Sequence, residues 1–273
     1  MASNNLADYI ISLPLILLAG YLFLRYFYFK QSEKEPASKV ILVTILGGIS
    51  VAIAFYAEQF FARYIGIANL GPDQLPYSEV VSKMVIMLLF VGFIEELSKF
   101  LAAMPIFFSK DFNRIRDGIF YMALAGLGFG LVEDFIYVGR VGAGGVILRL
   151  AFGLLFHPAA SGFIGYYLGR AKYGLSSMSA VFAALVRSML LHGLYDIGLV
   201  LQIPILAAFS TAIALLLYGY IFILYNNSEK QDRELGLETS SVYLFCPRCG
   251  FPNAHKDFCV KCGKKLLKDK VNV

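Results

Sequence analysis

The chain has 273 residues, of which 58% are hydrophobic and only 16% are charged, and its mean hydropathy is +0.67. Soluble globular domains seldom reach this hydropathy, so the composition predicts an all-α polytopic membrane protein that resides in a lipid bilayer. The formal net charge is +5. Because the basic residues fall mainly between apolar stretches, they indicate membrane topology, and we expect no nucleic acid partner.

Apolar stretches follow one another from the N-terminus to about residue 225. A transmembrane helix needs about 20 apolar residues, and on this criterion the sequence predicts about seven transmembrane helices. Their approximate ranges are 8–29, 40–62, 81–108, 117–139, 144–169, 178–201 and 203–225. No basic residue precedes the first stretch and no small-residue cleavage site follows it, so we expect a retained helix rather than a signal peptide.

The segments between these helices alternate in basic content. The basic ones are the first, third and fifth loops and the segment after the last helix, with Lys30, Lys34, Lys39, Lys110, Arg114, Arg116, Arg170, Lys172, Lys230 and Arg233. Basic loops tend to stay in the cytoplasm. The pattern therefore predicts an N-terminus outside and a C-terminus in the cytoplasm. We expect a membrane domain over 1–225 and a polar linker over 226–242.

A cysteine-rich module is predicted over 243–267. Its four cysteines form two CxxC pairs nine residues apart, and a glycine directly follows each pair: Cys246, Cys249, Cys259 and Cys262, then Gly250 and Gly263. This spacing favours a structural zinc ribbon over a redox dithiol pair. A module this small needs the metal for much of its folding energy. A cytoplasmic protein is the partner that such a ribbon would bind.

Ionisable residues also occur inside the predicted membrane spans. The third to sixth spans contain Glu95, Glu96, Lys99, Glu133, Asp134, His157, Arg187, His192 and Asp196. Each buried charge costs at least about 2.5 kcal/mol, so such groups tend to face a shared interior and to mark function. Five carboxylates face two fixed cations. The surplus acids must be protonated, bind a cation or line a wet cavity.

Helical spacing indicates which of these groups are neighbours. Lys99 lies four residues after Glu95 and three after Glu96, so it can neutralise one glutamate and leave the other for chemistry. The spacing does not decide which. His192 and Asp196 lie four residues apart on one face, so Asp196 can orient the imidazole ring.

Two mechanisms fit these residue types. In one, His157, His192 and a carboxylate such as Glu133 hold a catalytic zinc ion that activates a water molecule. In the other, a glutamate activates the water directly, and histidines serve as proton or oxyanion partners. The sequence contains no HExxH motif, which would favour the metal.

Taken in order, these motifs resemble the PrsW-type intramembrane protease family over about residues 80–200. Glu95, Glu96 and Lys99 match its EExxK motif, Phe129 and Glu133 its FxxxE segment, His157 its isolated histidine, and His192 with Asp196 its HxxxD motif. The family is distantly similar to the CAAX-processing and bacteriocin-immunity proteases. Relative to those, Lys99 lies one residue earlier in place of arginine, and Glu133 replaces a histidine. Asp134 stands where PrsW-like proteins often have asparagine.

The resemblance implies an endopeptidase in a prokaryotic cell membrane that cleaves a single-pass membrane protein such as an anti-sigma factor. It places the catalytic site at Glu95, Glu96, Lys99, Glu133, His157, His192 and Asp196, and the zinc ribbon lies outside this motif set. Two other functions are open. A cation or proton transporter would suit the surplus carboxylates, although the chain shows no internal repeat. A non-catalytic scaffold would use the ribbon alone, but the whole motif set argues against it.

Overall fold

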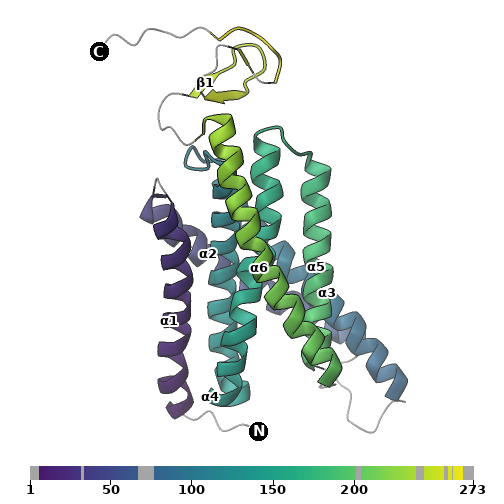
Figure 1. The fold of residues 1–273 in the computed structure, drawn as a ribbon. Helices are drawn as coiled ribbons and strands as arrows, with labels where there is room; N and C mark the ends of the chain where they lie inside the picture. The colour runs from purple at the N-terminus through teal and green to yellow at the C-terminus, as the bar shows by residue number, and fades with distance from the viewer. Residues whose placement is uncertain are drawn as a thin grey trace.

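The computed structural model describes residues 6–31, 34–66, 77–200, 204–237, 243–254, 258–259 and 261–266. Over these residues the chain forms a helical bundle with a small two-stranded module at one end (Figure 1). The helices are α1 (Leu6–Lys30), α2 (Ala37–Tyr64), α3 (Tyr77–Phe107), α4 (Ile115–Lys172), α5 (Met178–Val200) and α6 (Pro204–Leu235). The strands β1 (Tyr243–Phe245) and β2 (Pro252–Ala254) pair antiparallel.

The long helix α4 folds back on itself and supplies two membrane segments. Its first arm runs away from the two-stranded module and its second arm returns toward it (Figure 1). The arms pack antiparallel, because Gly118 lies against Gly165 and Gly169, while Gly126 lies against the backbone of His157. Over the described residues, all seven predicted membrane segments are therefore helical, and the predicted all-α polytopic architecture is confirmed.

Five segments among the described residues have the length and hydropathy of a membrane span. They are Leu6–Phe29, Ala37–Tyr64, Ile115–Gly139, Met178–Ile197 and Pro204–Leu235. The outer helices expose large apolar side chains, such as Tyr56 on α2 and Leu216 on α6, as lipid-facing surfaces do. The first arm of α4 is the most buried of the five and forms the centre of the bundle.

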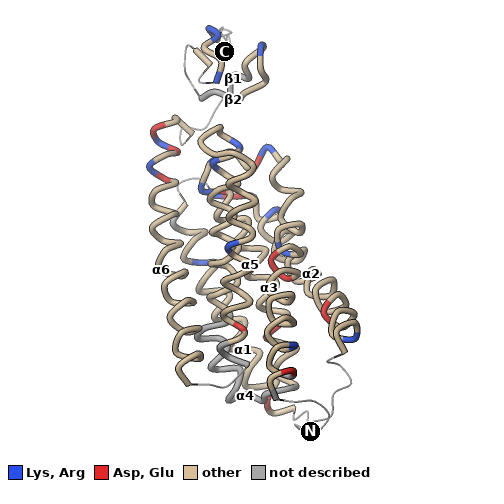
Figure 2. The backbone as a smooth tube through the Cα atoms, turned by 90° about the vertical axis from the view of Figure 1, so that its right-hand side faces the viewer, with Lys and Arg blue, Asp and Glu red and all other residues tan. Residues whose placement is uncertain are grey.

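Lysine and arginine residues gather at the end of the bundle that carries the two-stranded module (Figure 2). Two of them do more than mark topology, because Arg114 and Arg116 are 1% exposed. Arg114 pairs with both Glu35 and Asp117. The sequence does not predict this buried network, because the charge pattern of the loops does not distinguish a buried arginine from an exposed one.

The C-terminal part of α6 belongs to the same network. The helix continues to Leu235, so the first residues of the predicted linker are helical and only the later ones, 238–242, lie outside the described residues. The carboxylate of Asp232 accepts hydrogen bonds from the backbone N–H groups of Ile115, at 2.7 Å, and Arg116, at 3.3 Å. It thereby satisfies donors at the start of α4 that have no partner within that helix.

Glu35, in the loop between α1 and α2, connects that loop to the network. It is 4% exposed, accepts a hydrogen bond from Tyr121 at 2.6 Å, and shares the guanidinium of Arg114 with Asp117. Burial and, next, the nearby Asp117 carboxylate raise the pKa of Glu35 from about 4.5 to about 8. The folded protein therefore retains a proton here that the unfolded chain releases at lower pH.

The raised pKa predicts a specific dependence of stability on pH. Between about pH 5 and pH 8 the folded state binds more protons at Glu35 than the unfolded state, so this contribution to stability decreases as the pH rises. The slope is at most about 1.4 kcal/mol per pH unit. We expect the thermal midpoint of the protein in detergent to decrease as the pH rises from 6 to 8. The decrease should be less steep in Glu35→Gln. Equal slopes for the two proteins would contradict the assignment.

Candidate active site

Four helical segments bring all seven predicted site residues into one cluster. They are Glu95, Glu96 and Lys99 on α3, Glu133 on the first arm of α4, His157 on its second arm, and His192 and Asp196 on α5. Close helix packing makes this convergence possible. A Cβ atom at Gly92 would lie 2.5 Å from the Met189 carbonyl oxygen, and one at Gly126 would lie 2.5 Å from the His157 carbonyl oxygen. Only glycine allows the helices to approach so closely.

Lys99 is at the centre of the cluster. Its ammonium group, which is fully buried, lies 3.1 Å from Glu95 Oε2, 2.9 Å from Glu96 Oε1 and 2.9 Å from His157 Nδ1. Its Nζ atom also lies 4.1 Å from the centre of the Phe129 ring, so an aromatic face covers another side of the charge. The three N–H bonds of the ammonium group therefore have three acceptors.

His157 connects Lys99 to Glu133. An ammonium group carries no lone pair, so His157 Nδ1 must accept the hydrogen bond from Lys99. The proton of the neutral ring then resides on Nε2, which lies 2.8 Å from Glu133 Oε2 and donates to it. Both ring nitrogens are thus engaged, and the tautomer of His157 follows from its two neighbours.

His192 bridges the two adjacent glutamates. Its Nδ1 lies 2.9 Å from Glu96 Oε1, and its Nε2 lies 3.5 Å from Glu95 Oε2 and 3.7 Å from Asp196 Oδ2. The first distance is that of a hydrogen bond, whereas the other two leave Nε2 at the edge of a gap between two carboxylates. The expected proximity of His192 and Asp196 is present.

The two glutamates differ in their surroundings. Glu96 Oε1 contacts Lys99 and His192, its Oε2 accepts a 3.3 Å hydrogen bond from Ser188, and its side chain is 0% exposed. Glu95 interacts through Oε2 only, in the contacts that the described residues show, and is 6% exposed. The geometry therefore distinguishes the two residues that helical spacing could not. Glu96 is the carboxylate with more contacts, and Glu95 is the less completely buried of the two.

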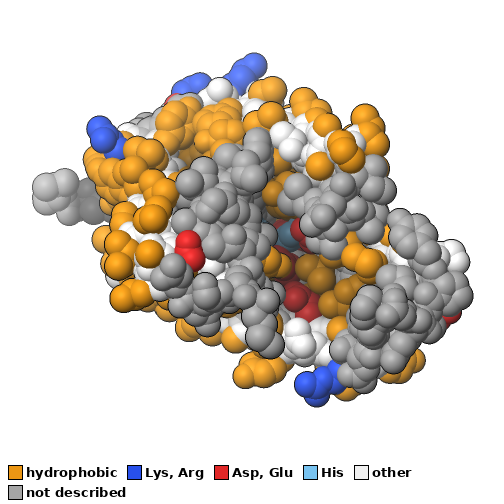
Figure 3. All heavy atoms as spheres, turned by 90° about the horizontal axis from the view of Figure 1, so that it is seen from below, with side chains coloured by type: hydrophobic (Ala, Val, Ile, Leu, Met, Phe, Trp, Pro, Cys, Tyr) orange, Lys and Arg blue, Asp and Glu red, His pale blue; other side chains and the backbone are white. Residues whose placement is uncertain are grey.

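The exposed fraction of the side chains in the cluster increases toward the end of the bundle opposite the two-stranded module. Glu133 and Asp196 are 16% and 20% exposed, whereas Lys99 and Glu96 are sealed. Seen from that end, the molecule has a hollow in which acidic side chains and a histidine are visible (Figure 3). Water can reach the cluster from this side, as hydrolysis inside a bilayer requires.

Two further polar residues belong to the site and were not predicted. The hydroxyl group of Ser188, fully buried on α5, lies 3.3 Å from Glu96 Oε2 and 3.2 Å from the Ala160 carbonyl oxygen, so these two acceptors share its one proton. Glu58 on α2 lies close enough for its charge to interact with those of Glu133 and Asp196. The sequence signal for Glu58 was a carboxylate within an apolar stretch. Ser188 gave no such signal, because serines are common in apolar helices.

Arg187 does not belong to the site. Its position in the sequence predicts a second cation that faces the carboxylates, but its side chain is exposed on the outer surface of α5. Lys99 is therefore the one lysine or arginine among the described residues that the structure places within this cluster. The neighbour of Glu133, Asp134, is buried as well.

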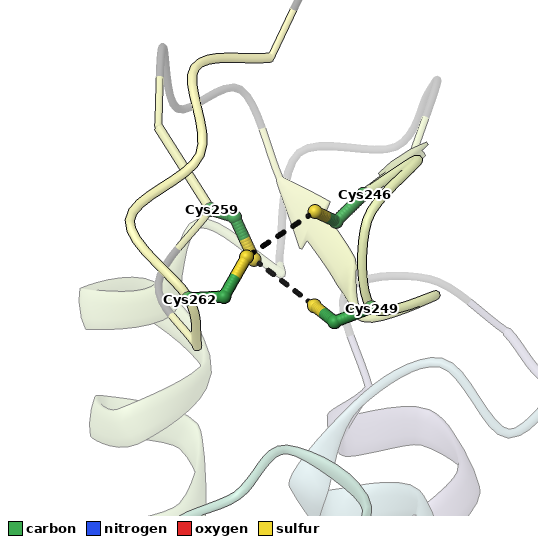
Figure 4. A group of neighbouring side chains, drawn as sticks. All are labelled: Cys246, Cys249, Cys259 and Cys262. Carbon is green, nitrogen blue, oxygen red and sulfur yellow. Dashed lines mark hydrogen bonds between the residues drawn. The ribbon is translucent and has the colours of Figure 1, made fainter.

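The four cysteines of the C-terminal module converge on one point (Figure 4). Cys246 Sγ lies 3.5 Å from Cys262 Sγ, and Cys249 Sγ lies 3.6 Å from Cys259 Sγ. These separations are too long for disulfides and close to the ~3.8 Å between sulfurs that bind one tetrahedral zinc ion. Each CxxC pair makes the same turn, with a 2.8 Å hydrogen bond from the backbone N–H of Gly250 or Gly263 back to the first cysteine.

A bundle of membrane-spanning helices with buried, convergent carboxylates, histidines and a lysine is the arrangement expected of an intramembrane hydrolase. Residues 35–225 match the family described as PrsW family intramembrane metalloprotease, and the chain belongs to this family. The chain is accordingly an intramembrane protease. The match ends before the cysteine module.

Named relatives agree with this assignment. The chain is 29% identical to Protease PrsW of Geobacillus kaustophilus over 180 residues, which cover 65% of this chain and 74% of the relative. It is 28% identical to Protease PrsW of Bacillus subtilis, with 65% and 77% covered, and 24% identical to that of Clostridioides difficile, with 73% and 81% covered. No solved structure matches the chain significantly.

The family description implies a catalytic metal, and the structure allows its fit to be examined. Glu95, His157 and His192 each offer a ligand atom within 4.8 Å of the others, a donor set that suits zinc. Glu133 is one carboxylate that the sequence offers as a ligand, and its Oε2 lies 2.8 Å from His157 Nε2. Lys99 donates to His157 Nδ1 and to Glu95, so this donor set does not fit a metal ion while the ammonium group holds its place.

The different surroundings of the two glutamates predict different losses of stability. Glu96→Gln removes the negative charge that Lys99 and His192 contact and places an amide N–H₂ at one of the two acceptor positions, and breaking such a buried ion pair costs about 3–5 kcal/mol. Glu95→Gln disturbs fewer contacts. We expect the thermal midpoint, measured by far-ultraviolet circular dichroism in detergent, to fall clearly more in Glu96→Gln. A larger fall in Glu95→Gln would contradict this assignment.

Proposed function

We propose that the chain hydrolyses a peptide bond of a single-pass membrane protein, in the manner of regulated proteolysis of an anti-sigma factor, and that Glu95 activates the water molecule. The observation that supports this role is the contrast between the two glutamates. Glu96 is 0% exposed and contacts Lys99, His192 and Ser188, whereas Glu95 is 6% exposed and its Oε2 lies 3.5 Å from His192 Nε2. A general base must reach both the water and the reacting group.

The proposed reaction proceeds through the groups of this gap. Glu95 takes a proton from water while the water oxygen bonds to the scissile carbonyl carbon. His192, with both ring nitrogens protonated, donates from Nδ1 to Glu96 and, flanked by Asp196, from Nε2 to the carbonyl oxygen as negative charge develops there. Glu95 then returns its proton to the amide nitrogen as the C–N bond breaks. Lys99, His157 and Glu133 position Glu95 and Glu96.

We also propose the orientation that the loop charges predict, with the N-terminus outside and the ribbon in the cytoplasm. The start of α1 and the ribbon lie at opposite ends of the bundle, and the basic residues gather at the ribbon end (Figures 1 and 2). In this orientation the hollow opens to the outer side of the membrane. A substrate would meet the site on the side opposite the ribbon.

The Cys246, Cys249, Cys259 and Cys262 cluster is proposed to bind one structural zinc ion in the cytoplasm. Four thiols at tetrahedral separations and two equivalent turns support this assignment. The ribbon would then serve as a binding module for a cytoplasmic partner, separate from the catalytic cluster.

Activity measurements test the assigned roles. We expect Glu95→Gln to reduce cleavage of a transmembrane reporter by at least about 100-fold, because general base catalysis contributes roughly 10²–10⁴ in rate. His192→Ala should reduce it comparably, since the Nε2 donor is lost. The matched control is Glu79→Gln on the same helix, an exposed glutamate that pairs with Lys83, and it should leave the rate unchanged.

Cleavage by Glu95→Gln at the wild-type rate would refute the role of Glu95. Proton or cation transport by wild-type protein in liposomes, without reporter cleavage, would instead favour a transporter.

Zinc removal tests the ribbon. We expect a Cys246→Ser, Cys249→Ser variant to lose bound zinc and to become sensitive to proteolysis after residue 237, because the metal stabilises the fold of the small module. The thermal midpoint of the helical bundle and cleavage of the reporter in detergent should not change. Elemental analysis and limited proteolysis measure both effects. Zinc content equal to that of wild type would contradict the assignment.

A further inference from the structure

The ammonium group of Lys99 occupies the position that a catalytic metal would need. Its Nζ lies 2.9–3.1 Å from Glu95 Oε2, Glu96 Oε1 and His157 Nδ1, and these three acceptors match its three N–H bonds. Two of the three, on Glu95 and His157, belong to the only group of histidine and carboxylate side chains that the described residues offer as a metal site inside the membrane.

A metal ion and this ammonium group exclude each other. Glu95 Oε2 and His157 Nδ1 are 4.0 Å apart. With metal–ligand bonds of about 2.0–2.2 Å, an ion bound to both would lie near their midpoint and within about 3 Å of Nζ. No ligand would separate the two cations there, and charges this close repel strongly in a site of low dielectric constant.

The other nitrogen of His157 offers no alternative. Nε2 carries the ring proton and donates to Glu133 Oε2 at 2.8 Å, a tautomer that Lys99 itself imposes through Nδ1. A metal could use Nε2 only if that proton left and Glu133 changed its contact. Lys99 therefore blocks the metal twice, through its charge and through the tautomer.

From these contacts we propose that Lys99 supplies the fixed positive charge that a metalloprotease obtains from its metal ion, and that this chain hydrolyses peptide bonds without a catalytic metal. The proposal rests on the proposed hydrolysis by Glu95 and His192. Lys99 acts as a positioning residue, because it holds Glu95, Glu96 and His157 and does not itself reach the gap at His192 Nε2.

Metal content tests the proposal independently of activity. We expect purified full-length protein to contain about one zinc ion per chain, all of it lost in the Cys246→Ser, Cys249→Ser variant. Cleavage of the reporter by that variant should continue in the presence of a chelator such as phenanthroline. A second metal ion per chain that remains in the cysteine variant, leaves on His192→Ala and is required for cleavage would overturn the proposal.

Metal binding by a variant that lacks the Lys99 ammonium group provides a second test. In the cysteine variant, Lys99→Ala removes the competing charge and frees His157 Nδ1, so we expect about one cobalt(II) ion to bind per chain, with the visible absorption of a nitrogen- and oxygen-ligated site. The control is Lys172→Ala, which should gain no metal, since Lys172 donates to the carbonyl oxygens of Phe107, the last residue of α3, and of Phe112 in the loop that follows.

The zinc count and cobalt binding test the exclusion of a metal by Lys99 separately from the proposed hydrolysis by Glu95 and His192. If Lys99→Ala fails to fold, the zinc count and the chelation experiment on proteins that retain Lys99 still decide the matter. Failure of the wild-type protein to cleave any reporter would count against the proposed function. The metal count would still decide whether Lys99 excludes a metal.

Discussion

The buried ammonium group of Lys99 is the interaction on which the interior of this protein depends. A lysine charge inside a membrane domain is tolerated only if acceptors surround it. Here Glu95 and Glu96 come from the same helix, His157 from a second segment and the Phe129 ring from a third. The positions of α3 and of both arms of α4 are thereby connected through one nitrogen atom. The helices approach one another around the Lys99 ammonium group, and glycines such as Gly92 and Gly126 allow this close packing.

Two buried polar layers follow one another along the bundle, and they differ in a way that bears on function. At the ribbon end, Arg114, Glu35, Asp117 and Tyr121 form a closed network whose members are buried. In the middle of the bundle, Lys99 and Glu96 are equally sealed, but Glu133 and Asp196 are partly exposed to a hollow. A layer that only stabilises the fold has no need for water. The graded exposure of the central layer is what a hydrolytic site requires.

The sequence was sufficient to predict the membrane segments, the seven residues of the central cluster and the cysteine module, because each leaves a local signal: hydropathy, a charge in an apolar span, or CxxC spacing. It could not distinguish Glu95 from Glu96. That distinction depends on Ser188 and His192, which lie more than 90 residues further along the chain. The sequence also misjudged Arg187, since the rotation of a helix about its axis depends on its neighbours. The burial of Arg114 and Arg116 depends on Glu35 and Asp232, which no local pattern connects to them.

The contact between Lys99 and His157 determines both the tautomer of His157 and the exclusion of a metal ion from the site. Solid-state nitrogen NMR of the isotope-labelled protein in bilayers can detect it, with the His157 signals assigned by their loss in His157→Gln. We predict a ring protonated at Nε2 and unprotonated at Nδ1, with Nδ1 in through-space contact with the Lys99 ammonium nitrogen. A ring protonated at Nδ1, or the absence of that contact in folded, active protein, would contradict the account.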